Sequence, residues 1–346
     1  MIFCIKLTKW GKCGNIIIGG IMLRDVVKKS NSYNRLKIEI CHDRLNHALM
    51  FVCQDEIYME EYLKQFLSLV FCENDIHDGA CGKCKGCISA YNLTNPDILI
   101  YGKNKVIDKD DAEDIVSNAP LRPYSSNKKV YVLYNYDQVN KTVENKLLKT
   151  IEEPPKDVVF VLLVSNLNKI LQTTLSRVQK VFLEPISYSD LIQLLKDENI
   201  TNPEVIAGSS CGSIKKALSY AQNNDIISIQ QLVLDLLSNM DATPKILSYS
   251  LKVMQFLDNI DDFLNSLQLT ISDIIKVKSN FTDGISNKLN LDKLSQIASM
   301  YSYTALTKIV EQTYISKQMA EVNVTKNNII DQLLLKIVEV RLKCKR

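Results

Sequence analysis

The feature that most constrains the fold is a run of seven consecutive apolar residues from Val158 to Val164. A run of this length without alternation is typical of a strand that is covered on both faces. A second short apolar strand is expected at Val130 to Leu133. Between the two, a helix is predicted to start after Asn140 as its N-cap and to stop at Pro154-Pro155. Its apolar stripe consists of Val143, Leu147, Leu148 and Ile151. Strand, helix and strand in this order predict a βαβ unit of a buried parallel sheet.

Four of the ten cysteines are crowded into one short segment with the spacing C-x₈-C-x₂-C-x₂-C; they are Cys72, Cys81, Cys84 and Cys87. Four thiolates at about 2.3 Å from one ion form a closed tetrahedral Zn²⁺ site, which is structural because no position is left for water. An iron–sulfur cluster could use the same ligands, and disulfides would need an oxidising compartment. The clustering favours zinc, with tight turns supplied by Gly79, Gly82 and Gly86. No shared role is expected for the scattered Cys4, Cys13, Cys41, Cys53, Cys211 and Cys344.

Length and composition set wide limits on function. A chain of 346 residues ordinarily divides into two or three domains, and 46% hydrophobic residues can fill their cores. The formal charge of +3 is too small to argue for nucleic-acid binding by itself. No apolar run approaches the roughly 18 residues that span a bilayer, so no membrane segment is predicted.

Two motifs next to the βαβ unit carry a resemblance to a known family. They read Asn145-Lys-Leu-Leu-Lys-Thr-Ile-Glu-Glu-Pro-Pro155 and Leu175-Ser-Arg-Val-Gln179. Both resemble the AAA+ module of bacterial replicative clamp loaders, the tau/gamma and delta-prime subunits of DNA polymerase III. The resemblance covers residues 22–346 and is strong from His47 to Pro185. It implies an α/β AAA+ fold, that is, a P-loop NTPase-like parallel sheet with an inserted zinc module, followed by a small helical lid and an all-α collar domain.

The resemblance also implies domain boundaries. The AAA+ core is expected at 22–185 with the zinc module at 72–91, the lid at 186–238 and the collar, an oligomerisation domain, at 239–346. The collar prediction agrees with successive amphipathic stretches, which are Ile246 to Leu257, Phe263 to Val277, Leu306 to Tyr314 and Ile329 to Leu342. Residues 1–21 are expected to be a loosely attached extension or to precede a true start at Met22, with an added strand as the alternative.

The phosphate-binding loop of this family would read G-x-x-x-x-G-K-[ST], and it falls on Cys53 to Glu60 here. Cys53 and Tyr58 replace the glycines, Met59 replaces the lysine and Glu60 replaces the hydroxyl residue. The glycines let backbone N–H groups wrap the phosphates, the lysine reaches the β and γ phosphates, and the hydroxyl holds Mg²⁺. Three further acidic residues are expected to add negative charge where a triphosphate would lie; they are Asp55, Glu56 and Glu61. No ATP is therefore expected to bind to this chain.

The second nucleotide element is changed as well. Where the family's strand ends in Asp-Glu, this chain has Tyr134-Asn135, which supplies no carboxylate. The Ser-Arg-Cys signature of the family is Ser176-Arg177-Val178, so the cysteine is lost and the arginine stays. The resemblance implies that Arg177 reaches into the ATP site of a neighbouring subunit. The alternative is that Arg177 pairs with a carboxylate such as Glu152 or Glu153 in its own domain.

These features predict a cytoplasmic, delta-prime-type subunit without ATPase activity of its own. The resemblance implies that its partners are tau/gamma and delta in a hetero-pentamer, the sliding clamp, and primed DNA, touched directly or indirectly. One alternative is an active tau/gamma-type ATPase, which would require tight ATP binding by the isolated chain. The other is a zinc-containing DNA-binding or regulatory protein on a decayed AAA+ fold, which would bind DNA without partners.

Overall fold

The computed structural model describes residues 23–222, 225–255, 260–281, 285–287, 290–321 and 324–344. The chain divides into two compact units, and the boundary between them lies between Ile186 and Ser187. The predictions for residues 1–21, including Cys4 and Cys13, lie outside the described residues. Among the described residues, no helix has the length and apolar character needed to cross a membrane.

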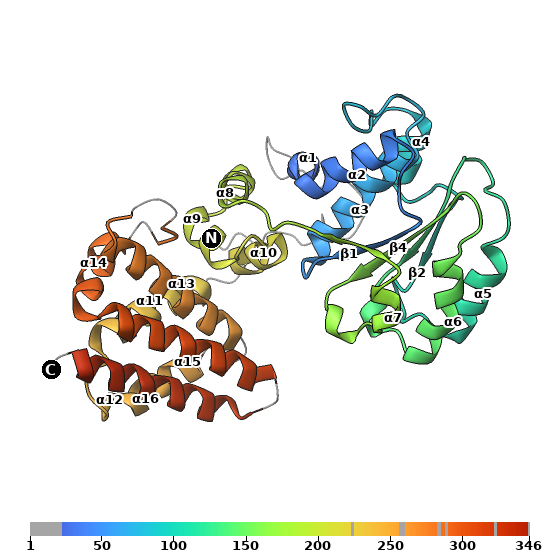
Figure 1. Cartoon of the computed structure of the whole chain (residues 1–346). Coiled ribbons are helices and arrows are strands. Elements are labelled where there is room, and N and C mark those ends of the chain that lie inside the picture. The colour runs from blue at the N-terminus through green and yellow to red at the C-terminus, as the bar shows by residue number, and fades with distance from the viewer. Residues whose placement is uncertain are drawn as a thin grey trace, which may run out of the picture. The chain divides into compact units, whose positions relative to one another are not determined.

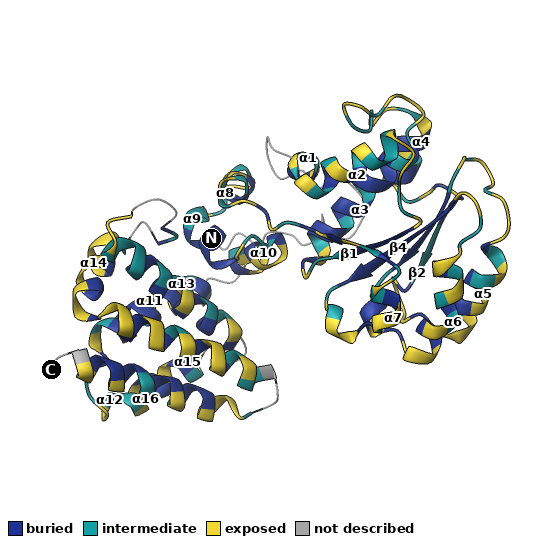
Figure 2. Cartoon of the chain, in the orientation of Figure 1, coloured by how far each residue is buried: buried dark blue, intermediate teal, exposed yellow. Residues whose placement is uncertain are grey.

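The first unit is built on a five-stranded parallel sheet in the order β2-β3-β4-β1-β5 (Figure 1). Its strands are β1 (Ala48–Val52), β2 (Ile98–Tyr101), β3 (Lys129–Leu133), β4 (Val158–Val164) and β5 (Gln179–Phe182). The seven-residue apolar run forms β4, which pairs with β1 and β3 and is buried at every position (Figure 2). The parallel sheet and the predicted βαβ unit are therefore confirmed.

Helices cover both faces of this sheet (Figure 1). The helices of this unit are α1 (Leu23–Lys29), α2 (Asn31–Cys41), α3 (Glu56–Val70), α4 (Lys85–Tyr91), α5 (Lys109–Asn118), α6 (Lys141–Glu152) and α7 (Gln172–Leu175). One face packs its aromatic residue Phe51 edge-on against Tyr62 and Phe66 of α3. The opposite face packs against apolar residues of α5 and α6, among them Ile115 and Leu147.

Helix α6 follows its sequence signals closely. Asn140 caps it, and the Asn140 side-chain oxygen accepts a hydrogen bond of 3.0 Å from the backbone N–H of Thr142. The helix ends at Glu152, just before the double proline, because proline cannot continue the backbone hydrogen-bond ladder. The position of α6 between β3 and β4 places its C-terminal end near the loop that leads into β5.

The second unit is entirely helical over its described residues. Its helices are α8 (Tyr188–Asp197), α9 (Pro203–Ser209), α10 (Ile214–Gln222), α11 (Asp225–Asn239), α12 (Lys245–Met254), α13 (Ile260–Lys278), α14 (Leu291–Met300), α15 (Tyr303–Glu321) and α16 (Lys326–Cys344). The four predicted amphipathic stretches correspond to α12, α13, α15 and α16, whereas α14 had not been predicted. The expected boundary at residues 238 and 239 falls inside α11, whose buried residues Val233 and Leu237 belong to the same apolar core as Phe263 of α13.

Candidate functional site

The loop after β1 is too short to wrap a phosphate. Strand β1 ends at Val52 and α3 begins at Glu56, so the helix starts within the segment where the phosphate-binding loop was expected. The Asp55 carboxylate caps the helix and accepts hydrogen bonds of 3.0 Å from the backbone N–H groups of Ile57 and Tyr58. N–H groups at such a helix N-terminus are the donors that bind a phosphate. In this chain a side chain of the protein already occupies two of them.

The substituted loop residues are part of the packed core. Tyr58 is 3% exposed and Met59 is 5% exposed, so neither can reach a ligand in solvent. The Cys53 N–H donates to the carbonyl of Val164 at 3.1 Å, which extends the pairing of β1 with β4. Burial raises the pKa of Cys53 to about 11, so its thiol is neutral at physiological pH. The side chains therefore fill the space that glycines would leave open.

Glu60 joins the two altered nucleotide elements. Its Oε2 accepts a hydrogen bond of 2.5 Å from the hydroxyl of Tyr134, and its Oε1 lies 2.9 Å from the Lys103 Nζ. Burial would raise the pKa of Glu60, but the hydrogen bonds from Tyr134 and Lys103 and the nearby charge of Lys64 outweigh it and lower the pKa. Glu60 is thus a paired carboxylate, and the two positions where the family would hold Mg²⁺ are bonded to each other.

The neighbouring strand ends are tied by polar residues. Asn135 adopts a left-handed conformation (φ 50°) and donates from Nδ2 to the carbonyl of Gly102 at 3.1 Å. Asp137, which is 8% exposed, accepts a hydrogen bond of 3.2 Å from the N–H of Asn166 at the end of β4. These contacts give both residues a structural role at the carboxyl edge of the sheet.

The four predicted cysteines come together at one point. Their sulfur atoms all lie within 4.8 Å of one another, and Cys87 is the most buried of the four. The sulfurs of Cys81 and Cys87 are 3.8 Å apart. In a tetrahedral site with metal–sulfur distances of about 2.3 Å, neighbouring sulfurs lie about 3.8 Å apart. The residues present fit one metal ion with a closed set of four thiolates.

Backbone N–H groups surround these sulfurs. The N–H of Cys84 points to the Cys81 sulfur at 3.4 Å, and the N–H of Cys87 points to the Cys84 sulfur at 3.3 Å. The backbone N–H groups of Lys83 and Cys84, followed by the side chain of Asn74, lower the pKa of Cys81 to about 6. Burial, by contrast, raises the pKa of Cys87. Metal ligation requires all four as thiolates, so binding releases protons.

Two positions of this segment favour glycine, each for a different structural reason. Gly82 has φ +69°, a backbone conformation that residues with a side chain rarely adopt. Gly86 lies in α4, where an added Cβ would meet the carbonyl oxygen of Phe71 at 1.9 Å. Gly86 is therefore required for the close approach of α4 to the end of α3 and not, as predicted, for a tight turn.

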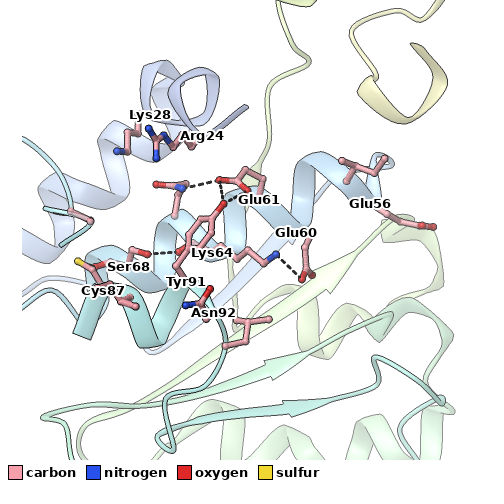
Figure 3. Close-up of a pocket in the computed structure, with 16 residues that line it drawn as sticks. Arg24, Lys28, Glu56, Glu60, Glu61, Lys64, Ser68, Cys87, Tyr91 and Asn92 are labelled. Carbon is pink, nitrogen blue, oxygen red and sulfur yellow. Dashed lines mark hydrogen bonds and ion pairs between the residues drawn. The ribbon is translucent and has the colours of Figure 1, made fainter. Parts of the chain in front are cut away.

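A cavity of about 590 Å³ lies beside the cysteine cluster, between α1, α3 and α4 (Figure 3). Glu61 lines it and accepts hydrogen bonds from Gln65 Nε2 at 2.8 Å and from the Tyr91 hydroxyl at 3.0 Å. The expectation that Glu61 adds charge at the phosphate position is wrong, because its side chain is 6% exposed and is bonded to α4. Burial raises the pKa of Glu61.

Arg177 lies on the segment between α7 and β5. Its Nε is 2.8 Å from Glu152 Oε2, and its Nη1 donates to the carbonyl of Thr173 at 2.9 Å. The side chain of Arg177 is 34% exposed. The pairing with Glu152 is the alternative that the sequence left open.

The sequence did not predict the side-chain contacts between residues that are far apart in the chain. It did not assign Asp55 as the cap of α3, and it did not pair Lys103 or Lys105 with a particular carboxylate. In the structure Lys103 pairs with Glu60, and Lys105 pairs with Asp108 at 2.8 Å. The one signal available for Asp55 was its position just ahead of an apolar helix, which is typical of an N-cap.

Comparison with known proteins agrees with the fold. The family model described as DNA polymerase III, delta subunit, matches residues 28–187, and the model described as DNA polymerase III, delta subunit, C terminal, matches residues 231–338. The chain is 25% identical over 224 residues to DNA polymerase III subunit tau/gamma of Haemophilus influenzae, covering 62% of this chain and 33% of that protein. It is 24% identical over 199 residues to DNA polymerase III subunit delta' of Bacillus subtilis, covering 56% of this chain and 59% of that protein. The chain thus spans well under two thirds of either relative.

A solved structure shows a looser likeness. The DNA polymerase III gamma-subunit-related protein of Thermotoga maritima aligns with a TM-score of 0.40 and 15% identity, covering 88% of this chain and 99% of that one.

The first unit combines a five-stranded parallel sheet with a four-cysteine module, and the second unit is helical over its described residues. The two family matches together cover well over half of the sequence. The chain belongs to the DNA polymerase III delta-subunit family.

Proposed function

We propose that this chain is a delta-prime-type subunit of a bacterial DNA polymerase III clamp loader and binds no ATP itself. In this role it joins tau/gamma and delta subunits in a cytoplasmic hetero-pentamer that loads the sliding clamp onto primed DNA. Family membership supports the assembly, and both tau/gamma and delta' proteins are among the relatives. The geometry of the loop after β1 supports the choice of a subunit without ATPase activity.

The observation that carries this choice is the closed phosphate loop. Asp55 occupies the helix N–H groups, Met59 is buried where a lysine would project, and Glu60 is bonded to Tyr134. A triphosphate at this place would meet two carboxylates and would have to open the cap of α3. Each of these obstacles acts independently, so no single side-chain movement restores the site.

Nucleotide binding by the purified chain tests this proposal. Titration with ATP or a non-hydrolysable analogue at physiological Mg²⁺ should give no saturable binding, whereas a tau/gamma subunit measured in parallel should bind. Micromolar affinity that is lost on a bulky substitution at Cys53 would overturn the proposal. That result would favour an active tau/gamma-type ATPase, the reading to which the similarity with tau/gamma proteins points.

The cysteine cluster is proposed to hold one structural Zn²⁺ through Cys72, Cys81, Cys84 and Cys87. The tetrahedral spacing of the sulfurs and the backbone N–H groups aimed at them support zinc, because closed four-thiolate sites of this kind are typical of structural zinc. In this proposal the ion holds the loop between α3 and α4 and takes no part in a reaction.

Arg177 is proposed to act in trans on the ATP site of a neighbouring subunit. A guanidinium delivered across an interface stabilises the charge on the transferring phosphoryl group, an effect of roughly 10³–10⁵ in rate in well-studied GTPases. In a reconstituted pentamer, Arg177→Ala should lower DNA-stimulated ATP hydrolysis by about threefold, which is less than the effect in GTPases because several ATP sites share the work. Assembly should be unchanged. The exposed Lys141 provides a matched control, since Lys141→Ala should leave hydrolysis as it is. Equal rates for Arg177→Ala and the unaltered complex would show that the arginine is only structural.

A further inference from the structure

Helix α6 holds the segment that carries Arg177 at two points. Near its start, Glu144 is 1% exposed and accepts hydrogen bonds of 2.6 Å from the Thr174 hydroxyl and of 3.1 Å from the Leu171 N–H. At its end, Glu152 contacts Arg177 itself. The two carboxylates are eight positions apart in the helix, a little more than two turns from each other.

The buried end of this arrangement fixes the backbone. Thr174 is fully buried, and its bond to Glu144 anchors α7 on α6. Because Arg177 follows only a few residues later, the position of its Cα is set by this anchor. The remaining freedom lies in the long arginine side chain.

The exposed end fixes the guanidinium. Glu152 lies 2.8 Å from Nε, and the Thr173 carbonyl accepts from Nη1 at 2.9 Å, so the planar group is held from two directions. An arginine has several rotatable bonds, and ordering them in advance reduces what must be fixed when a ligand arrives. Both contacts come from the same unit as Arg177, and the side chain remains 34% exposed toward solvent.

We propose that Glu152 is a positioning residue, which orients Arg177 for a phosphate on the neighbouring subunit. This inference rests on the proposed role of Arg177 in trans. It gives a common purpose to the two sequence motifs, because Glu152 belongs to the one that ends in the double proline and Arg177 belongs to the other. The partner group is the terminal phosphate of a nucleotide that this chain does not itself bind.

The alternative is an ordinary surface ion pair. Such pairs contribute little to stability, so removal of Glu152 should leave the fold and the thermal unfolding of the free subunit unchanged under either reading. Only the rate of hydrolysis in the assembled complex separates a positioning residue from a surface pair.

The test is steady-state ATP hydrolysis by the reconstituted pentamer on primed DNA. Glu152→Ala should lower kcat about twofold, a smaller loss than that of Arg177→Ala, while KM for ATP and assembly stay the same, because misplacing a transition-state group affects the rate more than ground-state binding. Glu152→Asp keeps the carboxylate charge that pairs with Arg177 and should recover part of the rate. The matched control is Glu153→Ala, since Glu153 is an exposed carboxylate at the adjacent position and should have no effect.

The double variant Arg177→Ala with Glu152→Ala decides whether Glu152 acts through the arginine. Its rate should equal that of Arg177→Ala alone. If the double variant is slower than Arg177→Ala, the positioning inference fails. It also fails if Glu152→Ala hydrolyses ATP at the normal rate or faster. Both results leave the proposed function intact, provided that Arg177→Ala is slow. If Arg177→Ala hydrolyses ATP at the normal rate, the proposed role of Arg177 in trans fails and the positioning role fails with it.

Discussion

The hydrogen bond between Glu60 and Tyr134 joins the two altered nucleotide elements. The residues are 74 positions apart, and each was read from sequence as a separate loss. In the folded chain the carboxylate and the phenol are partners, and the same carboxylate also pairs with Lys103. Restoring a hydroxyl residue at position 60 would therefore not rebuild a Mg²⁺ site.

The cysteine cluster gives a prediction at the same scale. Purified chain should contain one zinc ion, and Cys84→Ser should lose it, because a hydroxyl is a far poorer zinc ligand than a thiolate and structural sites of this kind contribute on the order of 10–16 kcal/mol to folding. Metal content measured by inductively coupled plasma mass spectrometry checks this.

Cys211 is the matched control for the cluster. It is exposed and lies in the second unit, so Cys211→Ser should keep the zinc. Chain without metal, or Cys84→Ser with its full zinc content, would contradict the assignment.

At the scale of elements, α16 closes the C-terminal end of α11. Arg341 of α16 is 6% exposed, and it donates to the carbonyls of Leu237 at 2.8 Å and Ser238 at 2.6 Å. Its guanidinium lies over the ring of Tyr301, whose hydroxyl also donates to Leu237 at 2.9 Å. These contacts satisfy carbonyls that a helix end leaves without intrahelical partners.

Arg341→Met should therefore destabilise the chain. Methionine keeps much of the apolar volume but removes the donors, and leaving buried carbonyls without a charged donor costs about 2–4 kcal/mol. Urea unfolding followed by circular dichroism measures this loss. Lys343→Met on the same helix is exposed and should change the free energy of unfolding by less than about 0.5 kcal/mol. Equal stabilities of the two variants would mean that Arg341 is dispensable as a cap.

The elements also show how far local signals extend. The N-cap Asn140, the double proline and the apolar stripe between them predicted α6 closely, because capping and helix termination depend on neighbouring residues. α14 was missed, since its ten residues, Leu291–Met300, give only a short apolar pattern. The expected lid and collar boundary, between residues 238 and 239, lies at the C-terminal end of α11.

At the scale of the whole molecule, the sequence alone determined the parallel sheet and the cluster of four cysteines. The unbroken apolar run of β4 is compatible only with a strand buried on both faces, and the close spacing of Cys81, Cys84 and Cys87 keeps their sulfurs near one another in any compact loop. Both patterns depend on residues that are close in sequence, so they can be recognised without knowing the tertiary structure.

Only the tertiary structure decided how the distant residues pair. Glu60 meets Tyr134, and Glu152 meets Arg177, because parallel strands bring successive strand ends to one edge of the sheet and α6 packs beside the segment that leads into β5. The sequence named Glu152 and Glu153 as equal candidates for Arg177. In the structure Arg177 pairs with Glu152, the last residue of α6, whereas Glu153 follows it with a non-helical backbone (φ −124°) that directs its side chain elsewhere.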